Sequence, residues 1–420
     1  MNGMTKLYKH QQEILIADPQ KCGIFHGTGS GKTRTALLLA SGKILIIAPK
    51  MQKIDRNWER EAKALGFSSI LKVISKEEFR RDFRKIPAFD TVIVDEAHTM
   101  AGVLPSMRYR NKKPIPKASQ LFEALQHYLS DNAPKRLYLL TATPARSPMA
   151  VWAFAQLLGQ LWDFYEFRNA FYVRLPWPGR EIWTPRKDAE SKKRLGKAIR
   201  LLGYTGKLSD WFDVPEQTHR TVSCELTKEQ ERYLENTPLL YPDPLVRLGK
   251  EHQIENGVFK RDDFSEVVVL KNNKIQKILS LLDEFPKVLI FAKYTAQIAS
   301  LKRELEAEGI ITYVMTGETK DRDRVLRNAE GSERCAFIAQ AQLSSGWEVP
   351  SFRCTIFASA SWSFVDLEQG RGRTLRANNL QKNLYVYLSA GKVDKAVWDA
   401  LQHKQDFNEA MYLGRNKIST

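Results

Sequence analysis

The chain has 420 residues, of which 43% are hydrophobic and 27% are charged, so its length exceeds one ordinary core and predicts two domains. No apolar run approaches the ~20 residues that span a bilayer, and the N-terminus lacks the apolar core of a signal peptide. These features exclude a membrane-spanning or secreted protein and predict the host cytoplasm or nucleoid. The formal net charge of +17 is spread over the whole chain and favours a polyanionic partner, above all nucleic acid.

The cysteine pattern points away from metal binding and disulfides. The four cysteines form no CxxC pair, and no histidine cluster accompanies them. A zinc site or a disulfide framework is therefore not expected, and reduced, buried thiols are the simpler interpretation.

The first half of the chain alternates short apolar runs with helical stretches. The runs are "CGIF" (22–25), "ILIIAPK" (44–50), "TVIVDEAH" (91–98) and "RLYLLTATP" (136–144). Continuous Val, Ile and Leu runs are typical of strands buried on both faces, hence of a parallel sheet between helices. Polar residues follow each run, and ligands of open α/β sheets bind at that edge.

The second half repeats this α/β design. A strand is expected at 287–292 and a helix at 295–309, followed by strands in "ITYVM", "CAFIAQ", "CTIFAS" and "NLYVYLS". We expect a first domain at 1–215, including a helical insertion at about 146–215, then a linker at 216–269 and a second domain at 270–420.

The stretch "HGTGSGKT" predicts a phosphate-binding loop between a strand and a helix. The backbone amides of Gly27, Thr28, Gly29, Ser30 and Gly31 would face the phosphates, helped by the dipole of the helix. Lys32 would reach the β- and γ-phosphates, and Thr33 would hold Mg²⁺. His26 replaces the usual first glycine, and the alternative is a flexible Gly/Ser turn.

The sequence "DEAH" follows a buried strand and supplies two carboxylates. Asp95 would bind Mg²⁺ and Glu96 would contribute to the metal site and deprotonate the attacking water; the alternative is a surface acid pair capping a helix. The hydroxyl residues of "TAT" (141–143) lie at a third strand end. They either couple the Mg²⁺ site to the rest of the fold or form a plain strand-to-turn transition.

Two stretches of the second half carry candidate chemistry. On a helix, Gln369, Arg373 and Arg376 of "EQGRGRTLR" would share a face, and the two arginines would suit a trans-acting arginine finger on the γ-phosphate. In "SSGWEVP", the hydroxyls, Gly346 and Glu348 would approach nucleotide or a nucleic-acid backbone. The alternatives are a solvated basic helix face and an ordinary loop.

Taken in order, GTGSGKT, DEAH, TATP and QxxGRxxR resemble the motif set of the superfamily-two helicases and translocases. The stretches "LTATPARSPMAVWAFAQLL", "CELTKEQERYLE" and "SWSFVDLEQGRGRTLR" are similar to the Swi/Snf-like branch. The resemblance covers nearly all of the chain, and the bare motor is similar to phage and bacterial DNA helicases. Departures are TAT where many remodelers have TGT, and Trp347 and Glu348 where small or Asp/Asn residues are commoner.

The resemblance implies two RecA-like domains with ATP and Mg²⁺ in the cleft between them, and nucleic acid across a basic face. It implies that Gln11 recognises adenine and that His98 links the Mg²⁺ site to the second domain. The family's nucleotide-binding and catalytic roles fall on Gln11, Gly29, Gly31, Lys32, Thr33, Asp95, Glu96, His98, Gly346, Glu348, Gln369, Arg373 and Arg376.

Backbone contacts are expected to dominate nucleic-acid binding, so no base code is predicted. Two basic segments qualify, "RYRNKKPIPK" (108–117) and "PRKDAESKKRLGKAIR" (185–200), although each is also compatible with a solvated face. The candidate contacts are Tyr109, which would stack on a base, and Arg110, Lys112, Lys113, Thr143 and Ser344.

The expected function is that of a monomeric ATP-dependent DNA translocase or helicase acting on duplex, forked or branched DNA in replication, recombination or repair. An RNA helicase and an ATP-gated clamp that does not step are the alternatives. The sequence indicates no wedge or pin for strand separation and does not decide between separating strands and moving along a duplex.

Overall fold

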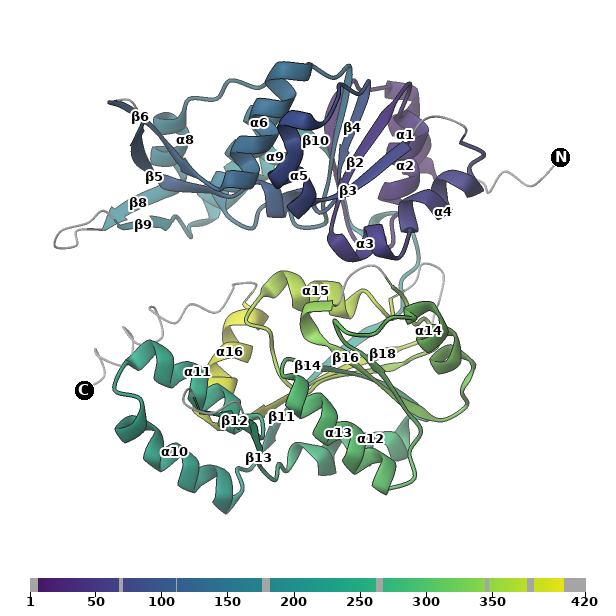
Figure 1. Cartoon of the computed structure of the whole chain (residues 1–420), viewed down its shortest axis with the longest axis vertical. Coiled ribbons are helices and arrows are strands. Elements are labelled where there is room, and N and C mark those ends of the chain that lie inside the picture. Colours follow the sequence, from purple (N-terminus) through teal and green to yellow (C-terminus); the bar gives the residue numbers. More distant parts are fainter. Residues whose placement is uncertain are drawn as a thin grey trace. The chain divides into compact units, whose positions relative to one another are not determined.

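The structure is a computed structural model that describes residues 7–67, 71–110, 112–175, 182–261, 267–343, 347–375 and 381–403. The chain divides into two compact units, unit 1 at Met1–Phe212 and unit 2 at Asp213–Thr420. Figure 1 shows a sheet flanked by helices in each unit. The predicted α/β class with two tandem parallel sheets is confirmed.

Unit 1 is built on a parallel sheet of six strands. Their order is β10 (Gly203–Gly206), β1 (Lys21–His26), β7 (Arg136–Leu140), β4 (Thr91–Val94), β2 (Ile44–Ala48) and β3 (Leu71–Ser75). The strands that the apolar runs predict are all present, and β7 lies between β1 and β4. The loops that follow β1, β7 and β4, which are distant in the sequence, therefore meet at one edge of the sheet.

Helices cover both faces of this sheet, because alternate strand residues point to opposite sides. Leu45 and Ile47 join one core, and Ile44 and Ile46 join the other. The helices that pack in the first core are α5 (Lys76–Asp82), α6 (Gln120–Asn132), α7 (Pro148–Leu157), α8 (Phe164–Phe171) and α9 (Ala189–Leu202). The helices that pack in the second core are α1 (Lys9–Ala17), α2 (Lys32–Leu39) and α4 (Asn57–Ala64). The short helix α3 (Lys50–Ile54) has no buried residue.

Two antiparallel hairpins and three 3₁₀ turns complete unit 1. The hairpins are β5 (Val103–Arg110) with β6 (Lys113–Ala118), and β8 (Tyr172–Leu175) with β9 (Ile182–Pro185). The turns are η1 (Phe83–Lys85), η2 (Ala97–Met100) and η3 (Leu208–Asp210). The segment expected as an insertion contributes α7 to the core and β10 to the main sheet, so it is partly integral to unit 1.

Unit 2 has its own parallel sheet of six strands. Their order is β11 (Gln217–Cys224), β18 (Asn383–Ala390), β17 (Cys354–Phe357), β14 (Lys287–Ala292), β16 (Cys335–Gln340) and β15 (Thr312–Met315). One face packs on α12 (Lys274–Glu284) and α13 (Thr295–Ala307), and the other on α14 (Arg322–Gly331), α15 (Phe364–Arg371) and α16 (Gly391–Gln402). The turn η4 (Ala341–Leu343) follows β16.

The segment expected as a linker is folded into unit 2. It supplies β11, which pairs with β18, then α10 (Lys228–Leu240), α11 (Pro244–Glu255) and the hairpin of β12 (Val258–Lys260) with β13 (Val267–Val269). Glu255 on α11 accepts hydrogen bonds from the backbone amides of Val393 (3.1 Å) and Asp394 (2.6 Å) on α16. The strand β11 is mostly exposed and polar, so the hydrophobic pattern does not reveal it.

The four cysteines are free and buried, as the cysteine pattern predicts. Burial raises the pKa of the Cys22 thiol to about 12. Within the described ranges, no helix has the length and apolar character needed to cross a bilayer.

Candidate active site

The three sequence motifs of unit 1 meet at the carboxyl edge of its sheet. The phosphate loop follows β1, the "DEAH" stretch follows β4, and "TAT" follows β7, which lies between them. Because the three strands are parallel neighbours, the loops share one edge, where open α/β sheets bind ligands.

The phosphate loop has a conformation that requires its glycines. Gly29 and Gly31 have φ angles of 76° and 79°, and a side chain at Gly31 would lie 2.6 Å from Nε2 of Gln11. Ser30 Oγ donates to the Gly27 carbonyl at 2.8 Å, and the Gly27 amide donates to the Gly206 carbonyl at 2.9 Å. These bonds hold the loop against the end of β10.

The predicted phosphate-binding lysine folds over this loop. Lys32 Nζ donates to the carbonyl oxygens of His26 at 2.9 Å and Gly27 at 3.0 Å. A phosphate oxygen is a charged acceptor and would form a stronger hydrogen bond than either carbonyl. The lysine therefore lies where the loop would receive a phosphate.

Gln11 stabilises the phosphate loop through hydrogen bonds. Its side chain is 1% exposed, and Nε2 donates to the Gly31 carbonyl and to Thr35 Oγ1, both at 3.3 Å. Its Oε1 accepts from the Tyr8 amide at 3.0 Å. The role in adenine recognition that the resemblance implies stays a prediction, since the amide is turned toward the start of α2.

A buried aromatic cluster, formed by His10, His26 and Trp211, lies beneath the loop. His10 bonds to the Ser30 carbonyl through Nε2 at 3.0 Å and stacks on Trp211 with ring centroids 3.9 Å apart. The centroids of His26 and Trp211 are 4.6 Å apart. Burial lowers the pKa of His26 to about 3, aided by the positive charges of His10 and Lys32. The imidazole at the unusual first position of the motif is therefore neutral and structural.

The carboxylate of Asp95, the first of the two in "DEAH", is buried. Asp95 is 6% exposed; its Oδ1 accepts from the Glu96 amide at 2.9 Å and its Oδ2 from Trp58 Nε1 at 3.3 Å. Burial raises the pKa of Asp95 to about 6, with a further contribution from the charge of Glu96. A bound cation would favour the ionised form of this carboxyl group.

The second carboxylate has a strained backbone and a histidine partner. Glu96 has a φ of 45°, uncommon for a residue other than glycine, and Oε2 lies 3.3 Å from His98 Nδ1. Burial opposes ionisation of Glu96, but His98 and the ammonium groups of Lys32 and Lys76 outweigh it, so the pKa is lowered. Glu96 is thus held as an anion.

His98 also connects the carboxylate to the third motif. Its Nδ1 lies 2.9 Å from Thr141 Oγ1, and that oxygen accepts from the Thr143 amide at 3.1 Å. The "TAT" stretch and the acidic motif are therefore in contact within unit 1, and its coupling of the Mg²⁺ site to the rest of the fold stays a prediction. The expected link from His98 to the second domain stays a prediction.

Lys76 is a site residue that the sequence analysis missed. It is 7% exposed at the start of α5, and Nζ donates to the Glu96 carbonyl at 2.9 Å and to Thr99 Oγ1 at 2.5 Å. Burial lowers its pKa to about 8, against the attraction of Glu96 and Asp95. A lysine directly after a buried strand, at the ligand-binding edge, was the available signal.

The donor set of unit 1 fits the Mg²⁺ that the resemblance implies. Thr33 and Asp95 offer hard oxygen donors, and Mg²⁺ commonly takes only one or two protein ligands besides phosphate and water. In the described ranges, no group of three or more His, Cys, Asp and Glu side chains is placed to hold a metal ion.

In unit 2, the predicted catalytic arginine Arg373 makes hydrogen bonds to residues of the same unit. The guanidinium of Arg373 donates to the carbonyl oxygens of Trp347 and, at 2.8 Å, Gln369, and Arg373 is 7% exposed. The Val349 amide donates to the Arg373 carbonyl at 3.0 Å. Arg373 thereby ties the stretch containing Trp347 to the end of α15, while Glu348 is exposed.

From the sequence, Gln369, Arg373 and Arg376 were expected to share one face of a helix, and the structure corrects this expectation. Helix α15 ends at Arg371, and residues 372–374 form a turn, because two glycines at 370 and 372 weaken the helix. Arg376, Ser344 and Gly346 lie outside the described residues.

The remaining nucleic-acid candidates divide between two places. Thr143 is half-buried beside the active site, whereas Tyr109, Arg110, Lys112 and Lys113 are exposed on the β5–β6 hairpin. The two groups belong to different parts of unit 1, and their contacts with nucleic acid stay predictions.

Three comparisons relate the chain to known proteins. Residues 271–378 match the family model of the helicase conserved C-terminal domain. A search of the curated proteins found no match. Among solved structures, the Sulfolobus solfataricus SWI2/SNF2 ATPase core in complex with dsDNA is similar at 17% identity, with 95% of this chain and 91% of that chain covered and a TM-score of 0.40.

The fold defines the class: two α/β units in tandem, each with a six-stranded parallel sheet, the first with a phosphate loop and an acidic motif at one sheet edge. Residues 271–378 of the second match the helicase conserved C-terminal domain. This match supports the helicase part of the resemblance in unit 2.

Proposed function

We propose that this chain is a DNA-stimulated ATPase that couples ATP hydrolysis to movement along DNA, or to remodelling of forked, recombination or repair intermediates. The observation that carries the proposal is the meeting of Lys32, Glu96 and the His98–Thr141 pair at one edge of the unit 1 sheet. The helicase C-terminal domain in unit 2 supports a motor rather than a simple nucleotide-binding protein.

The chemistry follows from the residues of unit 1. The loop amides and Lys32 hold the phosphates of ATP, and Glu96 accepts a proton from the water whose oxygen attacks the γ-phosphorus. The bond from the γ-phosphorus to its bridging oxygen breaks, and ADP and phosphate leave. Mg²⁺, held by Thr33 and Asp95, would neutralise charge on the phosphate oxygens. Gln369, Arg373 and Arg376 are proposed to assist this step.

The net charge of +17 supports a nucleic-acid partner whose phosphates are bound through counterion release. We propose DNA as this partner, with most contacts to the backbone. RNA is the alternative partner, and an ATP-gated clamp that turns over slowly is the alternative activity.

The test is the steady-state ATPase rate without nucleic acid and with single-stranded DNA, duplex DNA, forked DNA and RNA at one salt concentration. Stimulation by DNA is expected, and stimulation by RNA alone would favour the RNA helicase. Slow turnover with tight, ATP-dependent DNA binding would favour the clamp. No stimulation by any substrate, together with no ATP-dependent binding of nucleic acid, would contradict all three.

Two variants test the assignment of residues. Glu96→Gln should lower turnover about 10²–10⁴-fold, the usual contribution of a general base, while DNA binding survives. Lys32→Ala should abolish turnover in the same way, and Lys50→Ala, at an exposed lysine of the same unit, is the matched control. Normal turnover by Glu96→Gln would remove the proposed base.

A further inference from the structure

The hairpin of β5 and β6 carries an unusual concentration of exposed positive charge. Residues 103–118 contain three lysines and two arginines and no acidic residue. Around its tip, Tyr109, Arg110, Lys112 and Lys113 are exposed, and Tyr109 is 79% exposed. The hairpin extends away from the sheet of unit 1 (Figure 1). The positive charge at this tip favours an anionic partner.

Contacts near both ends of the hairpin hold it on unit 1. Near the tip, Arg108 pairs with Glu123 on α6, and at the base the Ser119 amide donates to the Gly102 carbonyl at 2.7 Å. Val103 is 4% exposed and pairs with Ala118 across the hairpin. A side chain at Gly102 would lie 2.8 Å from Ser119 Oγ, so the two strands leave the body of unit 1 through a close contact.

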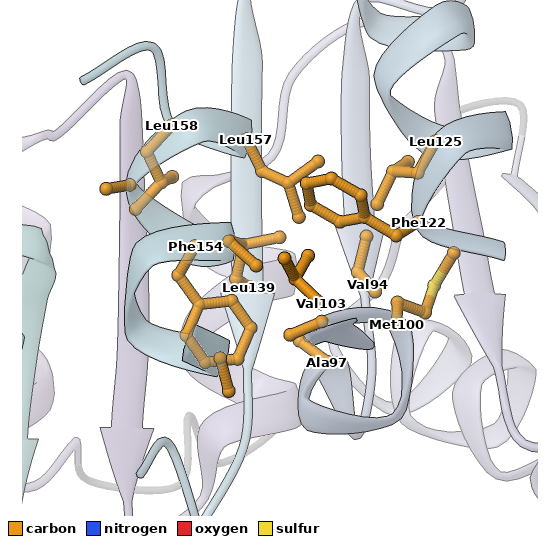
Figure 2. Close-up of a cluster of buried hydrophobic side chains, with 14 of the residues drawn as sticks. Val94, Ala97, Met100, Val103, Phe122, Leu125, Leu139, Phe154, Leu157 and Leu158 are labelled. Carbon is orange, nitrogen blue, oxygen red and sulfur yellow. The ribbon is translucent and has the colours of Figure 1, made fainter. Parts of the chain in front are cut away.

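The hairpin begins shortly after the acidic motif in the sequence. Turn η2 follows Glu96, and β5 begins three residues after the end of η2. Figure 2 shows Ala97 and Met100 of η2 and Val103 of β5 in one cluster with Val94 and Phe122. Lys76 holds both ends of the turn, through the Glu96 carbonyl and Thr99 Oγ1. The turn that follows Glu96 and the start of the hairpin therefore share one packed cluster.

The edges of the hairpin are poorly suited to pairing with a strand of another protein. Pro105 lies on β5, and Pro114 and Pro116 lie on β6. Proline lacks the amide that a sheet ladder needs and is a common device against edge-to-edge association. Tyr109 faces Pro114 across the hairpin, which leaves the ring at the end of a stiff projection.

A groove of about 560 Å³ lies beside the hairpin. It is lined by Arg110 and Ile115 of the hairpin, Gln126 and His127 of α6, and Gln156 of α7. The rest of its lining is largely apolar, with Phe122 and Trp152, and includes Glu123, and its volume suits one nucleotide unit. A DNA strand that leaves the duplex at the hairpin tip would fit in this groove along unit 1.

We propose that the β5–β6 hairpin is an arm that engages forked DNA at the junction where the duplex opens. Tyr109 stacks on the last base pair, and Arg110, Lys112 and Lys113 hold the phosphates of the diverging strands. The inference rests on the proposed ATPase function and adds a strand-separating element to it. Stacking needs an aromatic face and no particular base, so the arm is independent of sequence.

The experiment compares unwinding of a forked DNA duplex with ATPase activity on single-stranded DNA, in the full chain. Tyr109→Ala should lower the unwinding rate about fivefold or more, the effect of losing one stacking contact, while the ATPase rate on single strands stays within about twofold. Tyr109→Phe keeps the ring and should unwind normally. Leu104→Ala, which truncates a half-exposed apolar residue of the same hairpin, is the matched control.

A second measurement reads stacking directly. 2-Aminopurine placed at the junction of the fork should change its fluorescence on binding of the full chain and of Tyr109→Phe, and not on binding of Tyr109→Ala. Unchanged unwinding by Tyr109→Ala, or an equal loss of its single-strand ATPase, would overturn the arm. Wild-type protein with DNA-stimulated ATPase but no unwinding would overturn the arm alone, and absence of stimulation would overturn the proposed function.

Discussion

Lowering the pH from 7 to 5 should destabilise unit 1 through His26. This imidazole is 2% exposed, packs 4.6 Å from the Trp211 ring, and has a pKa of about 3 because burial and the nearby positive groups oppose protonation. The unfolded chain, with an ordinary histidine pKa near 6.5, binds a proton that the folded chain does not bind in this range. The stabilising contribution is therefore present above pH 6.5 and falls as the pH drops toward 3.

The size of the effect follows from the two pKa values of this one group. One pKa unit corresponds to about 1.36 kcal/mol, so pH 5, which lies 1.5 units below the unfolded pKa, removes about 2 kcal/mol. A His26→Gln variant lacks this titration. Its absolute stability will differ because the packing changes, but its loss between pH 7 and pH 5 should be smaller by about 2 kcal/mol.

The assay is urea unfolding of the full chain at pH 7, 6 and 5, with hydrogen exchange of a peptide covering β1 and the phosphate loop to report on unit 1. The same substitution at exposed His127 controls for loss of one imidazole from the chain. Carbon-13 shifts of the His26 ring give an independent reading. A ring that takes up its proton between pH 7 and pH 5 would refute the argument from burial.

Further perturbations test the remaining parts of the structure. Lys76→Met should lower kcat at least about tenfold with little change in ATP affinity, because it frees the Glu96 backbone, and Lys76→Arg should restore part of the rate; equal losses in both quantities would contradict a positioning role. Lys274→Met should destabilise unit 2 by about 3–5 kcal/mol in urea unfolding, because Asp394 loses its 2.6 Å partner in a fully buried site. Arg376→Ala should reduce kcat far more than ATP binding, as measured by single-turnover kinetics. DNA affinity measured against salt should fall with a log–log slope of about 0.9 per phosphate contacted, and a flat response would contradict backbone binding.

The sheets and the central motifs are predictable from the sequence because each rests on local information. Buried parallel strands such as "ILIIA" and "VLIFA" are apolar along their whole length, and the phosphate loop has a fixed spacing. The strand β11 was not predicted because its side chains are mostly exposed, so it carries no apolar pattern. The shared face of Gln369 and Arg373 depended on a helix through both residues, and α15 ends at Arg371 between two glycines.

The parts of the site that the sequence does not reveal depend on contacts between distant residues. His10 and Trp211 are far apart in the chain and meet because β10 pairs with β1, which no local pattern encodes. Lys76 reaches Glu96 because β3 and β4 flank β2 in the sheet. The rule that ligands gather at strand ends pointed to this edge, but only the strand order decides which side chains meet there.

The turn after Glu96 connects the proposed catalytic site to the hairpin. A left-handed residue other than glycine costs about 1–2 kcal/mol, so Glu96 keeps this conformation only because its surroundings impose it. The carboxylate of Asp95, the ammonium group of Lys76 and the ring of His98 all contact this residue. Close-packed clusters switch between discrete arrangements and do not deform gradually. We therefore expect a change in charge at Glu96 during hydrolysis to act first on η2, whose Met100 lies in one packed cluster with Val103 of β5.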